Sequence, residues 1–251
     1  MNKQYVGGFV SVKSILEGKS RDIYQILLDK ERYQNIMSSK FHAAEKRQYE
    51  YIAQSKIPTN FVSKNEFDEL IDSSTTGGIA AEVGPRKFST LDDILKTKNG
   101  YFTILDGIED PFNFGYALRS LYAAGVDGVI LPKRNFFTAT ETVVRASAGA
   151  SELLQCCETE NLAEACAKIK EKGIRLISTA KTEKAKDVFR TNFHRPICIV
   201  YGGEKRGISA EVMEQCDLTI KIKYPRNCHY SLPACSAISI ISFEIAKKMS
   251  K

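Results

Sequence analysis

Three segments of the chain combine an apolar, strand-like run with a polar loop and the start of a helix. They are Leu105–Ser120, Val200–Ser209, and the stretch that joins Asp217–Ile222 to Tyr230–Ala237. In a parallel α/β domain, ligands bind beyond the carboxyl ends of the strands, so polar side chains in such loops are well placed for chemistry. An amide, a guanidinium and a carboxylate there could orient a reacting group and stabilise the charge that develops on it.

The polar residues of these loops also have ordinary structural uses. Asn113 could cap a helix, Glu204 could lie at a helix start and interact favourably with the helix dipole, and Ser231 could be a simple N-cap. Taken one at a time, none of these residues distinguishes a functional site from a capped helix. A functional interpretation therefore depends on the order and spacing of all three segments.

Common cofactor and metal motifs are absent from the sequence. No strand-like run is followed by a G-x-G-x-x-G fingerprint, and the chain has no GKS or GKT phosphate loop. These absences argue against NAD enzymes and nucleotide hydrolases. The three histidines, His42, His194 and His229, have no ligand spacing, so we expect no bound metal.

The elements that position the three loops follow from an alternation of strand and helix patterns beyond residue 99. Helices are predicted over Asn113–Ala124, Asn161–Lys172, Ser209–Cys216 and Ser236–Met249, and Gly173 stands where the second of them should stop. The predicted strands are Phe102–Leu105, Val126–Leu131, Glu152–Cys156, Ile174–Ser178, Ile197–Tyr201 and Leu218–Ile222. Such alternation predicts an α/β domain with a mainly parallel sheet and helices on both faces.

The first part of the chain is predicted to be a separate, small α/β domain. Its expected elements are a periodic segment over Ser11–Leu16, strands over Asp22–Leu28, Phe61–Val62 and Ile79–Val83, and helices over Lys40–Gln54 and Glu66–Ile71. The stretch 84–100 mixes turn formers and lysines, which is typical of an interdomain connection. We therefore predict a first domain over residues 1–88, a linker over 89–98 and a second domain over 99–251.

Bulk composition restricts the class of protein. At 251 residues and 43% hydrophobic content, the chain can bury one large core or two ordinary ones. Its formal net charge of +6 suits an anionic partner but does not establish one. Seven scattered cysteines without CxxC spacing predict reduced thiols, and no apolar run approaches the roughly 20 residues needed to cross a bilayer. Because the polar N-terminus lacks a secretion signal, we expect a cytoplasmic protein without a membrane partner.

Together, the three segments resemble the motifs of SpoU-type (TrmH) methyltransferases of the SPOUT superfamily. The first motif, N-x-G-x-x-x-R, and the second, G-x-E-x-x-G, are filled by Asn113, Gly115 and Arg119 and by Gly202, Glu204 and Gly207. Val144–Ala150 resembles the RASAGA stretch that these proteins carry after their second strand. The first domain is similar to the ribosomal-protein-like RNA-binding domain found in front of many members, with Gly77–Ala81 in the place of its closing strand.

The resemblance implies a fold, a cofactor and a reaction. The fold is a C-terminal domain with a deep trefoil knot, and the cofactor is S-adenosylmethionine, held mainly by backbone groups. The residues expected to bind it are Thr179, Gly202, Gly203, Ile222, Ser231 and Leu232. The reaction is methyl transfer to a ribose 2'-hydroxyl, with Arg119 beside the ribose either lowering the hydroxyl's pKa or relaying its proton. Asn113 would shape its loop or contact a phosphate, and Glu204 would fix the cofactor loop and orient the arginine.

The resemblance also implies partners. The first domain would bind structured RNA, most of all 23S ribosomal RNA, through phosphate and 2'-hydroxyl contacts. Candidate RNA-binding residues are Lys13, Arg21, Lys46, Arg47 and Arg145, for which a solvated face or, for Arg145, an ion pair is the alternative. The final helix would help to form a homodimer with two active sites at the interface. Its stripe of Ile238, Ile241 and Ile245 could equally be ordinary core.

The third motif departs from the family pattern at one position. Where SpoU-type proteins usually have Ser-Leu-Asn-Val-Ser, this chain has Ser231-Leu232-Pro233-Ala234-Cys235. Proline removes a side-chain amide that could position a substrate or a backbone group. The alternative function is therefore a catalytically impaired RNA-binding protein that has kept the fold and associates with ribosomes.

Overall fold

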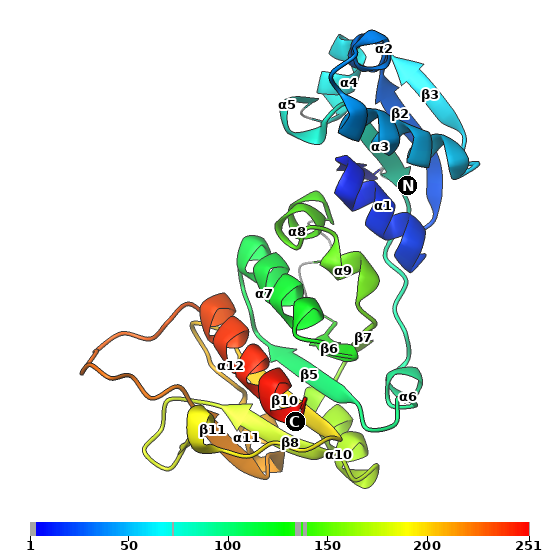
Figure 1. Cartoon of the computed structure of the whole chain (residues 1–251). Coiled ribbons are helices and arrows are strands. Elements are labelled where there is room, and N and C mark those ends of the chain that lie inside the picture. Colours follow the sequence, from blue (N-terminus) through cyan, green and yellow to red (C-terminus); the bar gives the residue numbers. More distant parts are fainter. Residues whose placement is uncertain (1–3, 72, 134–136, 138–139, 251) are drawn as a thin grey trace. The chain divides into compact units, whose positions relative to one another are not determined.

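The computed structural model describes residues 4–71, 73–133, 137 and 140–250. Contacts divide the chain into two compact units, Met1–Lys87 with Ala139–Leu153, and Phe88–Thr138 with Leu154–Lys251 (Figure 1). The sequence interpretation placed the segment 139–153 in the second domain, whereas its contacts lie in the first unit. The predicted boundaries of independently folding domains stay a prediction.

The first unit contains a four-stranded mixed sheet in the order β1-β4-β2-β3. β1 and β2 pair antiparallel with β4, and β3 pairs parallel with β2. The strands are β1 (Gln4–Gly7), β2 (Ile23–Asp29), β3 (Thr59–Val62) and β4 (Ile79–Val83). The helices are α1 (Phe9–Gly18), α2 (Lys30–Ser38), α3 (Ala43–Gln54), α4 (Lys64–Leu70), α5 (Ser73–Thr76), α8 (Thr140–Ala146) and α9 (Ala150–Leu153). The predicted small α/β domain in front of the larger one is confirmed.

Two helices of this unit begin at side chains that accept backbone hydrogen bonds. At the start of α2, the carboxylate of Asp29 accepts a hydrogen bond from the Arg32 N–H at 3.0 Å. At the start of α4, Ser63 and Glu66 form a reciprocal capping box. The sequence interpretation missed α2, because Ile36 is the only residue of that helix that is buried and its apolar periodicity is therefore weak.

The prediction of a strand over Glu152–Cys156 was wrong. The chain forms α9 up to Leu153, and strand β7 begins only at Cys156. Two glycines allow α9 to approach α1 closely: a Cβ at Gly18 would lie 2.1 Å from the Glu152 carbonyl oxygen, and one at Gly149 would lie 2.0 Å from Ser14 Oγ. This close packing favours the helical turn over the extended backbone that the apolar pattern suggested.

The second unit contains a seven-stranded sheet in the order β7-β6-β5-β10-β8-β11-β9, and every neighbouring pair is parallel. The strands are β5 (Tyr101–Asp106), β6 (Gly128–Pro132), β7 (Cys156–Thr159), β8 (Arg175–Thr179), β9 (Lys186–Asp187), β10 (Ile197–Gly202) and β11 (Leu218–Lys221). The helices are α6 (Leu91–Ile94), α7 (Pro111–Ala123), α10 (Leu162–Glu171), α11 (Ala210–Gln215) and α12 (Ala234–Met249), with a 3-10 turn over Val188–Arg190. The predicted parallel sheet is confirmed, and the trefoil knot stays a prediction.

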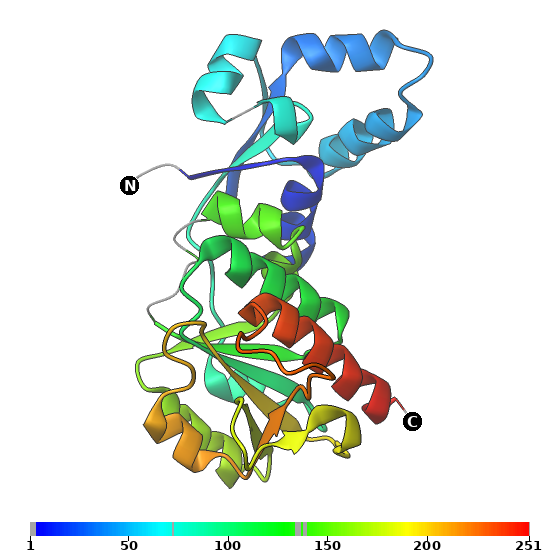
Figure 2. The same ribbon diagram turned by 90° about the vertical axis from the view of Figure 1, so that its left-hand side faces the viewer.

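The helices of the second unit cover both faces of the sheet. α7 and α12 lie side by side on one face in both views (Figures 1 and 2), and they contact each other extensively. On the other face, Ala165, Ile169 and Val212 of α10 and α11 pack into a core with strand residues that include Phe102 and Val200. This arrangement leaves the carboxyl ends of the central strands open for a site.

Candidate functional site

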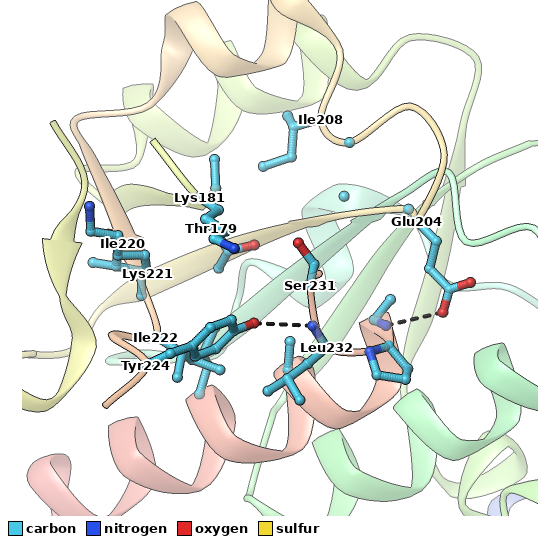
Figure 3. Close-up of a pocket in the computed structure, with 18 residues that line it drawn as sticks. Thr179, Lys181, Glu204, Ile208, Ile220, Lys221, Ile222, Tyr224, Ser231 and Leu232 are labelled. Atoms are coloured by element: carbon cyan, nitrogen blue, oxygen red, sulfur yellow. Dashed lines mark hydrogen bonds between the residues drawn. The ribbon is translucent and has the colours of Figure 1, made fainter. Parts of the chain in front are cut away.

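A cavity of about 580 Å³ lies at the carboxyl ends of β8, β10 and β11. Its walls come from the loops after these three strands and from the first turns of α12 (Figure 3). Ligands of α/β sheets bind beyond the carboxyl ends of the strands, and the cavity volume falls within the range of about 300–1,000 Å³ that is usual for small-molecule sites.

All six residues that the sequence predicted to bind the cofactor line this cavity: Thr179, Gly202, Gly203, Ile222, Ser231 and Leu232. They come from three separate loops, so only the tertiary fold brings them together. The hydroxyl of Thr179 donates to the Val200 carbonyl oxygen at 3.0 Å and thereby ties β8 to β10. The binding roles of the six residues stay a prediction.

The glycines of the second motif permit a close approach of two loops. A Cβ at Gly203 would lie 1.6 Å from the Gly107 carbonyl oxygen, and one at Gly202 would lie 2.3 Å from the Gly207 carbonyl carbon. The Gly203 N–H donates to the Asp106 carbonyl oxygen at 2.8 Å. A larger residue at position 203 would push the loop after β10 away from the loop after β5, which carries the first motif, whereas one at position 202 would collide with Gly207 of its own loop.

Ion pairs and hydrogen bonds reinforce this contact between the two loops. The Asp106 carboxylate accepts hydrogen bonds from the Ser209 N–H at 2.8 Å and from the Ser209 hydroxyl at 2.9 Å, at the start of α11. Lys205 Nζ lies 2.8 Å from the Glu109 carboxylate, and the hydrogen bond between them raises the pKa of Lys205. Sequence reasoning missed Asp106 and Glu109, because neither belongs to a motif.

Glu204 connects all three motifs. Its Oε1 accepts a hydrogen bond from Asn113 Nδ2 at 3.2 Å and another from the Ala234 N–H at 3.1 Å (Figure 3 shows the second). Cys235 Sγ lies 3.5 Å from Asn113 Oδ1. Asn113 itself lies in the first turn of α7, where its N–H donates to the capping carboxylate of Asp110 at 2.8 Å. The carboxylate therefore fixes the loop after β10 relative to the starts of α7 and α12.

The Glu204 carboxylate supplies a hydrogen-bond acceptor at the start of α12, where Pro233 has no polar side chain to do so. Pro233 is the N-cap residue of α12 and makes no side-chain cap hydrogen bond. The N–H groups in the first turn of a helix need acceptors, which an N-cap side chain usually supplies. Here Glu204 supplies one from another loop, through its bond to Ala234. The departure from the family motif thus leaves the start of α12 stabilised.

Arg119 does not line the cavity of its own chain. It lies exposed on α7, one turn beyond Tyr116 and two turns beyond Phe112, whose exposed fractions are 46% and 55%. Ser120 Oγ lies 2.7 Å from Ser239 Oγ, which joins this side of α7 to α12. The structure therefore places Arg119 on an exposed, partly aromatic face of α7, outside the cavity.

The predicted apolar stripe of the last helix is core. Ile238, Ile241 and Ile245 are buried within their own unit, as the alternative interpretation held. The large hydrophobic side chains that α12 exposes instead are Ile240, at 37%, and Phe243, at 50%. A subunit contact that removes apolar surface of this helix from water would therefore use these two side chains.

Within the part of the chain that the structure describes, no three His, Cys, Asp or Glu side chains gather as they would around a metal ion. Among the same residues, no helix combines the length and the apolar character that crossing a membrane requires.

The sequence model of the SpoU rRNA Methylase family matches residues 101–243. That range is more than half of the chain and includes all three motif segments. The chain belongs to this family. The SpoU domain coincides with most of the second unit and contains every residue that lines the cavity.

Curated relatives agree with this assignment. A Staphylococcus haemolyticus protein named as a TrmH family tRNA/rRNA methyltransferase is 36% identical over 200 residues, which cover 78% of this chain and 79% of that protein. A Staphylococcus aureus protein of the same name is 37% identical over 198 residues, 77% of this chain and 79% of that protein.

Solved structures show the same fold. The SpoU methyltransferase AviRb of Streptomyces viridochromogenes, in complex with AdoMet, has a TM-score of 0.78 and 20% identity, and the match covers 98% of this chain and 90% of that one. An AdoMet-bound rRNA methyltransferase of Sinorhizobium meliloti has a TM-score of 0.75 and 16% identity over 98% and 87% of the two chains. The predicted enzyme class, an RNA 2'-O-ribose methyltransferase that depends on S-adenosylmethionine, is confirmed by the family.

The cationic residues of the first unit differ in their surroundings. Arg47 is exposed and Lys46 half-buried, both on α3, and Lys13 pairs with Glu17 at 3.6 Å. Residues 30–47, which form α2 and the start of α3, carry five Lys or Arg against two Glu, a net charge of +3 within a chain of +6. At the loop between these helices, Phe41 is 92% exposed, a feature that sequence reasoning missed.

Like Lys13, two further predicted RNA-binding residues are engaged in ion pairs. Arg145 pairs with Glu141 at 3.2 Å on the surface of α8, which is the alternative that the sequence left open. Arg21 requires a correction, because its side chain is only 1% exposed and its Nε lies 3.1 Å from the buried Glu152 carboxylate. Burial lowers the pKa of Arg21. A buried guanidinium that is paired inside the unit cannot serve as a surface contact for RNA.

Proposed function

We propose that this SpoU-family protein transfers the methyl group of S-adenosylmethionine to a ribose 2'-hydroxyl of 23S ribosomal RNA in the cytoplasm. The family's description and the relatives named as tRNA/rRNA methyltransferases support an RNA substrate. Ribosomal RNA is favoured because the chain has the additional N-terminal unit, and a solved structure that covers 98% of the chain is named as an rRNA methyltransferase.

The observation that carries the proposal is the convergence of six predicted cofactor residues on one cavity. The chemistry of these six residues fits S-adenosylmethionine. Glycines at 202 and 203 leave backbone groups accessible, Ile222 and Leu232 offer apolar surface, and the volume is that of a small-molecule site. When bound, S-adenosylmethionine supplies an electrophilic methyl carbon on a positively charged sulfur. The chain needs only to hold it in place, and the cavity is built largely from backbone and apolar groups.

The chain's own residues would prepare the ribose hydroxyl. A 2'-hydroxyl is a weak nucleophile, so the site must align it with the methyl carbon and favour loss of its proton. A guanidinium group carries a positive charge over a wide range of pH, and we assign that of Arg119 the electrostatic stabilisation of the developing alkoxide. Glu204 positions the cofactor loop through Asn113 and Ala234, and the Asn113 amide orients the start of α7.

A homodimer would bring Arg119 to a cavity. The exposed aromatic and aliphatic side chains of α7 and α12, Phe112, Tyr116, Ile240 and Phe243, form an apolar face on the second unit. A second copy that covers this face would remove it from water, which is the main driving force for such association. Because Arg119 lies on the same face and outside its own cavity, we propose that it completes the site of the partner.

Mixed dimers test this arrangement. Arg119→Ala and Gly203→Val each remove one part of the proposed composite site, and each homodimer should be inactive. Co-expression of the two variants with different affinity tags allows the mixed dimers to be isolated. In a mixed dimer, the Arg119→Ala chain supplies an intact cavity and the Gly203→Val chain supplies Arg119 to it. Methyl transfer should therefore return at that one site. Mixed dimers that stay inactive, although both variants fold and dimerise, would overturn the contribution of Arg119 to the partner.

The reaction itself is tested with labelled S-adenosylmethionine and total RNA from a strain that lacks this gene. The proposal predicts transfer of the label to 23S ribosomal RNA. Transfer to tRNA alone would refute the proposed substrate. RNA binding without any transfer would favour the alternative, a catalytically impaired RNA-binding protein.

A further inference from the structure

The loop between β11 and α12 forms one wall of the cavity, and a single tyrosine holds part of it. Tyr224 lines the cavity, and its hydroxyl oxygen accepts a hydrogen bond from the Leu232 N–H at 3.1 Å (Figure 3). This bond joins the two ends of the loop. It also occupies the backbone donor of Leu232, a residue that the proposed function assigns to cofactor binding.

A lysine that also lines the cavity, in the loop after β8, holds the loop between β11 and α12 through its backbone carbonyls. Lys181 follows β8, and its Nζ donates to the carbonyl oxygens of Cys228 at 3.1 Å and Tyr230 at 3.2 Å. The same ammonium lies 5.1 Å from the centroid of the Tyr224 ring, within the range of a cation–π contact. The order of the loop therefore does not depend on the Tyr224 hydroxyl alone.

These contacts have opposite consequences for a ligand in the cavity. The bonds of Lys181 keep the wall of the cavity in place, which lowers the entropic cost of binding. The Tyr224 hydroxyl competes with the ligand for the Leu232 N–H, because one N–H group donates one good hydrogen bond at a time. A ligand atom can accept that bond only after the Tyr224 hydroxyl has moved away.

We propose that Tyr224 is a gating residue of the cofactor pocket and that Lys181 is its positioning residue. In the free protein, the Tyr224 hydroxyl satisfies the Leu232 N–H and occupies the space in front of it. On cofactor binding, the hydroxyl gives up this N–H to an acceptor of the adenosine part, while Lys181 keeps residues 228–230 ordered. This inference rests on the proposed function, since it assumes that the adenosine part lies against Leu232.

Two substitutions separate the two roles. Tyr224→Phe keeps the ring and removes only the competing oxygen, so S-adenosylmethionine should bind about two- to tenfold more tightly, the equivalent of one ordinary hydrogen bond. Lys181→Met removes both carbonyl bonds and the charge over the ring, and binding should weaken by about tenfold or more because the loop must be ordered by the ligand. Lys223→Met is the matched control, since it removes an exposed charge from the same loop.

The dissociation constant of S-adenosylmethionine is measured by calorimetry, and the melting temperature of each ligand-free variant is measured beside it. A merely structural tyrosine would lower the melting temperature and weaken binding together. The proposed gate predicts opposite signs for Tyr224→Phe, with a melting temperature that is lower or unchanged and tighter binding. Unchanged or weaker binding by Tyr224→Phe would overturn the gate, and unchanged binding by Lys181→Met would overturn the positioning role.

The wild-type measurement separates this inference from the function on which it rests. If the wild-type protein binds no S-adenosylmethionine, the proposed cofactor site fails, and the gate fails with it. If wild type binds and transfers methyl groups while Tyr224→Phe shows no gain, only the gate is refuted.

Discussion

Replacement of Glu152 by glutamine should destabilise the first unit more than any substitution at an exposed ion pair. The Glu152 side chain is fully buried, and its Oε2 lies 3.1 Å from Arg21 Nε and 3.3 Å from Arg86 Nη1, whose side chains are 1% and 3% exposed. Ser20 Oγ also donates to this oxygen. One buried carboxylate therefore pairs with two buried guanidinium groups.

The magnitude follows from the burial of these ion pairs. Removing one partner of a buried ion pair costs about 3–5 kcal/mol, because the remaining charge stays away from water and loses the carboxylate that offset that cost. Glutamine keeps an oxygen that can accept a hydrogen bond, so we expect the lower end of this range, about 3 kcal/mol. Glu141→Gln is the matched control. It removes the surface partner of Arg145, at 40% exposure, and should cost about 0.5 kcal/mol or less.

Hydrogen exchange measures the loss of stability at individual backbone amides. Such a local measurement is needed because a chain with two compact units does not have to unfold in a single step. Amides of α1 and α9 should exchange roughly 100-fold faster in Glu152→Gln than in wild type, the equivalent of about 3 kcal/mol. Amides of the second unit should exchange at wild-type rates. Equal protection of α1 and α9 in Glu152→Gln and Glu141→Gln would refute the reasoning from burial.

Three further predictions concern the site and the RNA. Arg119→Ala should abolish methyl transfer and leave the dissociation constant of S-adenosylmethionine nearly unchanged by calorimetry; normal turnover would contradict its assigned role. Phe41→Ala should weaken binding to an RNA hairpin with an unpaired loop by about five- to 100-fold in fluorescence anisotropy, because exposed aromatic rings stack on bases. Tyr24→Ala, at a 52% exposed tyrosine outside α2 and α3, is its control and should bind as wild type does. Pro233→Asn should hardly change the transfer rate, since Glu204 already accepts the Ala234 N–H, and a large gain would show that the missing amide limits catalysis.

Local sequence signals predicted the elements of the second unit well. The helix predicted from Asn113 corresponds to α7, which starts at Pro111 and is capped by Asp110. The helix predicted from Asn161 corresponds to α10, where the Asn161 side chain accepts hydrogen bonds from two backbone N–H groups. The strands Ile174–Ser178 and Ile197–Tyr201 were predicted within one residue of β8 and β10. Buried parallel strands are continuous apolar runs, so their positions can be inferred from the sequence alone.

Features that depend on distant contacts were not predictable in the same way. Glu152 looked like part of a strand, and Arg21 like a surface cation, because the sequence does not reveal that the two meet in the interior across more than a hundred residues. The isoleucines of α12 could be core or interface on periodicity alone, and only their burial in the folded unit identifies them as core. The family resemblance identified the residues of the cavity, whereas the links through Glu204, Lys181 and Tyr224 required coordinates.

The most direct test of the proposed reaction is the position of the transferred methyl group on the nucleotide. RNA labelled by the protein with S-adenosylmethionine is hydrolysed in alkali, which cleaves the chain only where a free 2'-hydroxyl can attack the adjacent phosphate. A 2'-O-methyl group blocks that attack, so the account predicts that the label stays in alkali-stable dinucleotides. Label released in mononucleotides would place the methyl group on a base and contradict a ribose methyltransferase.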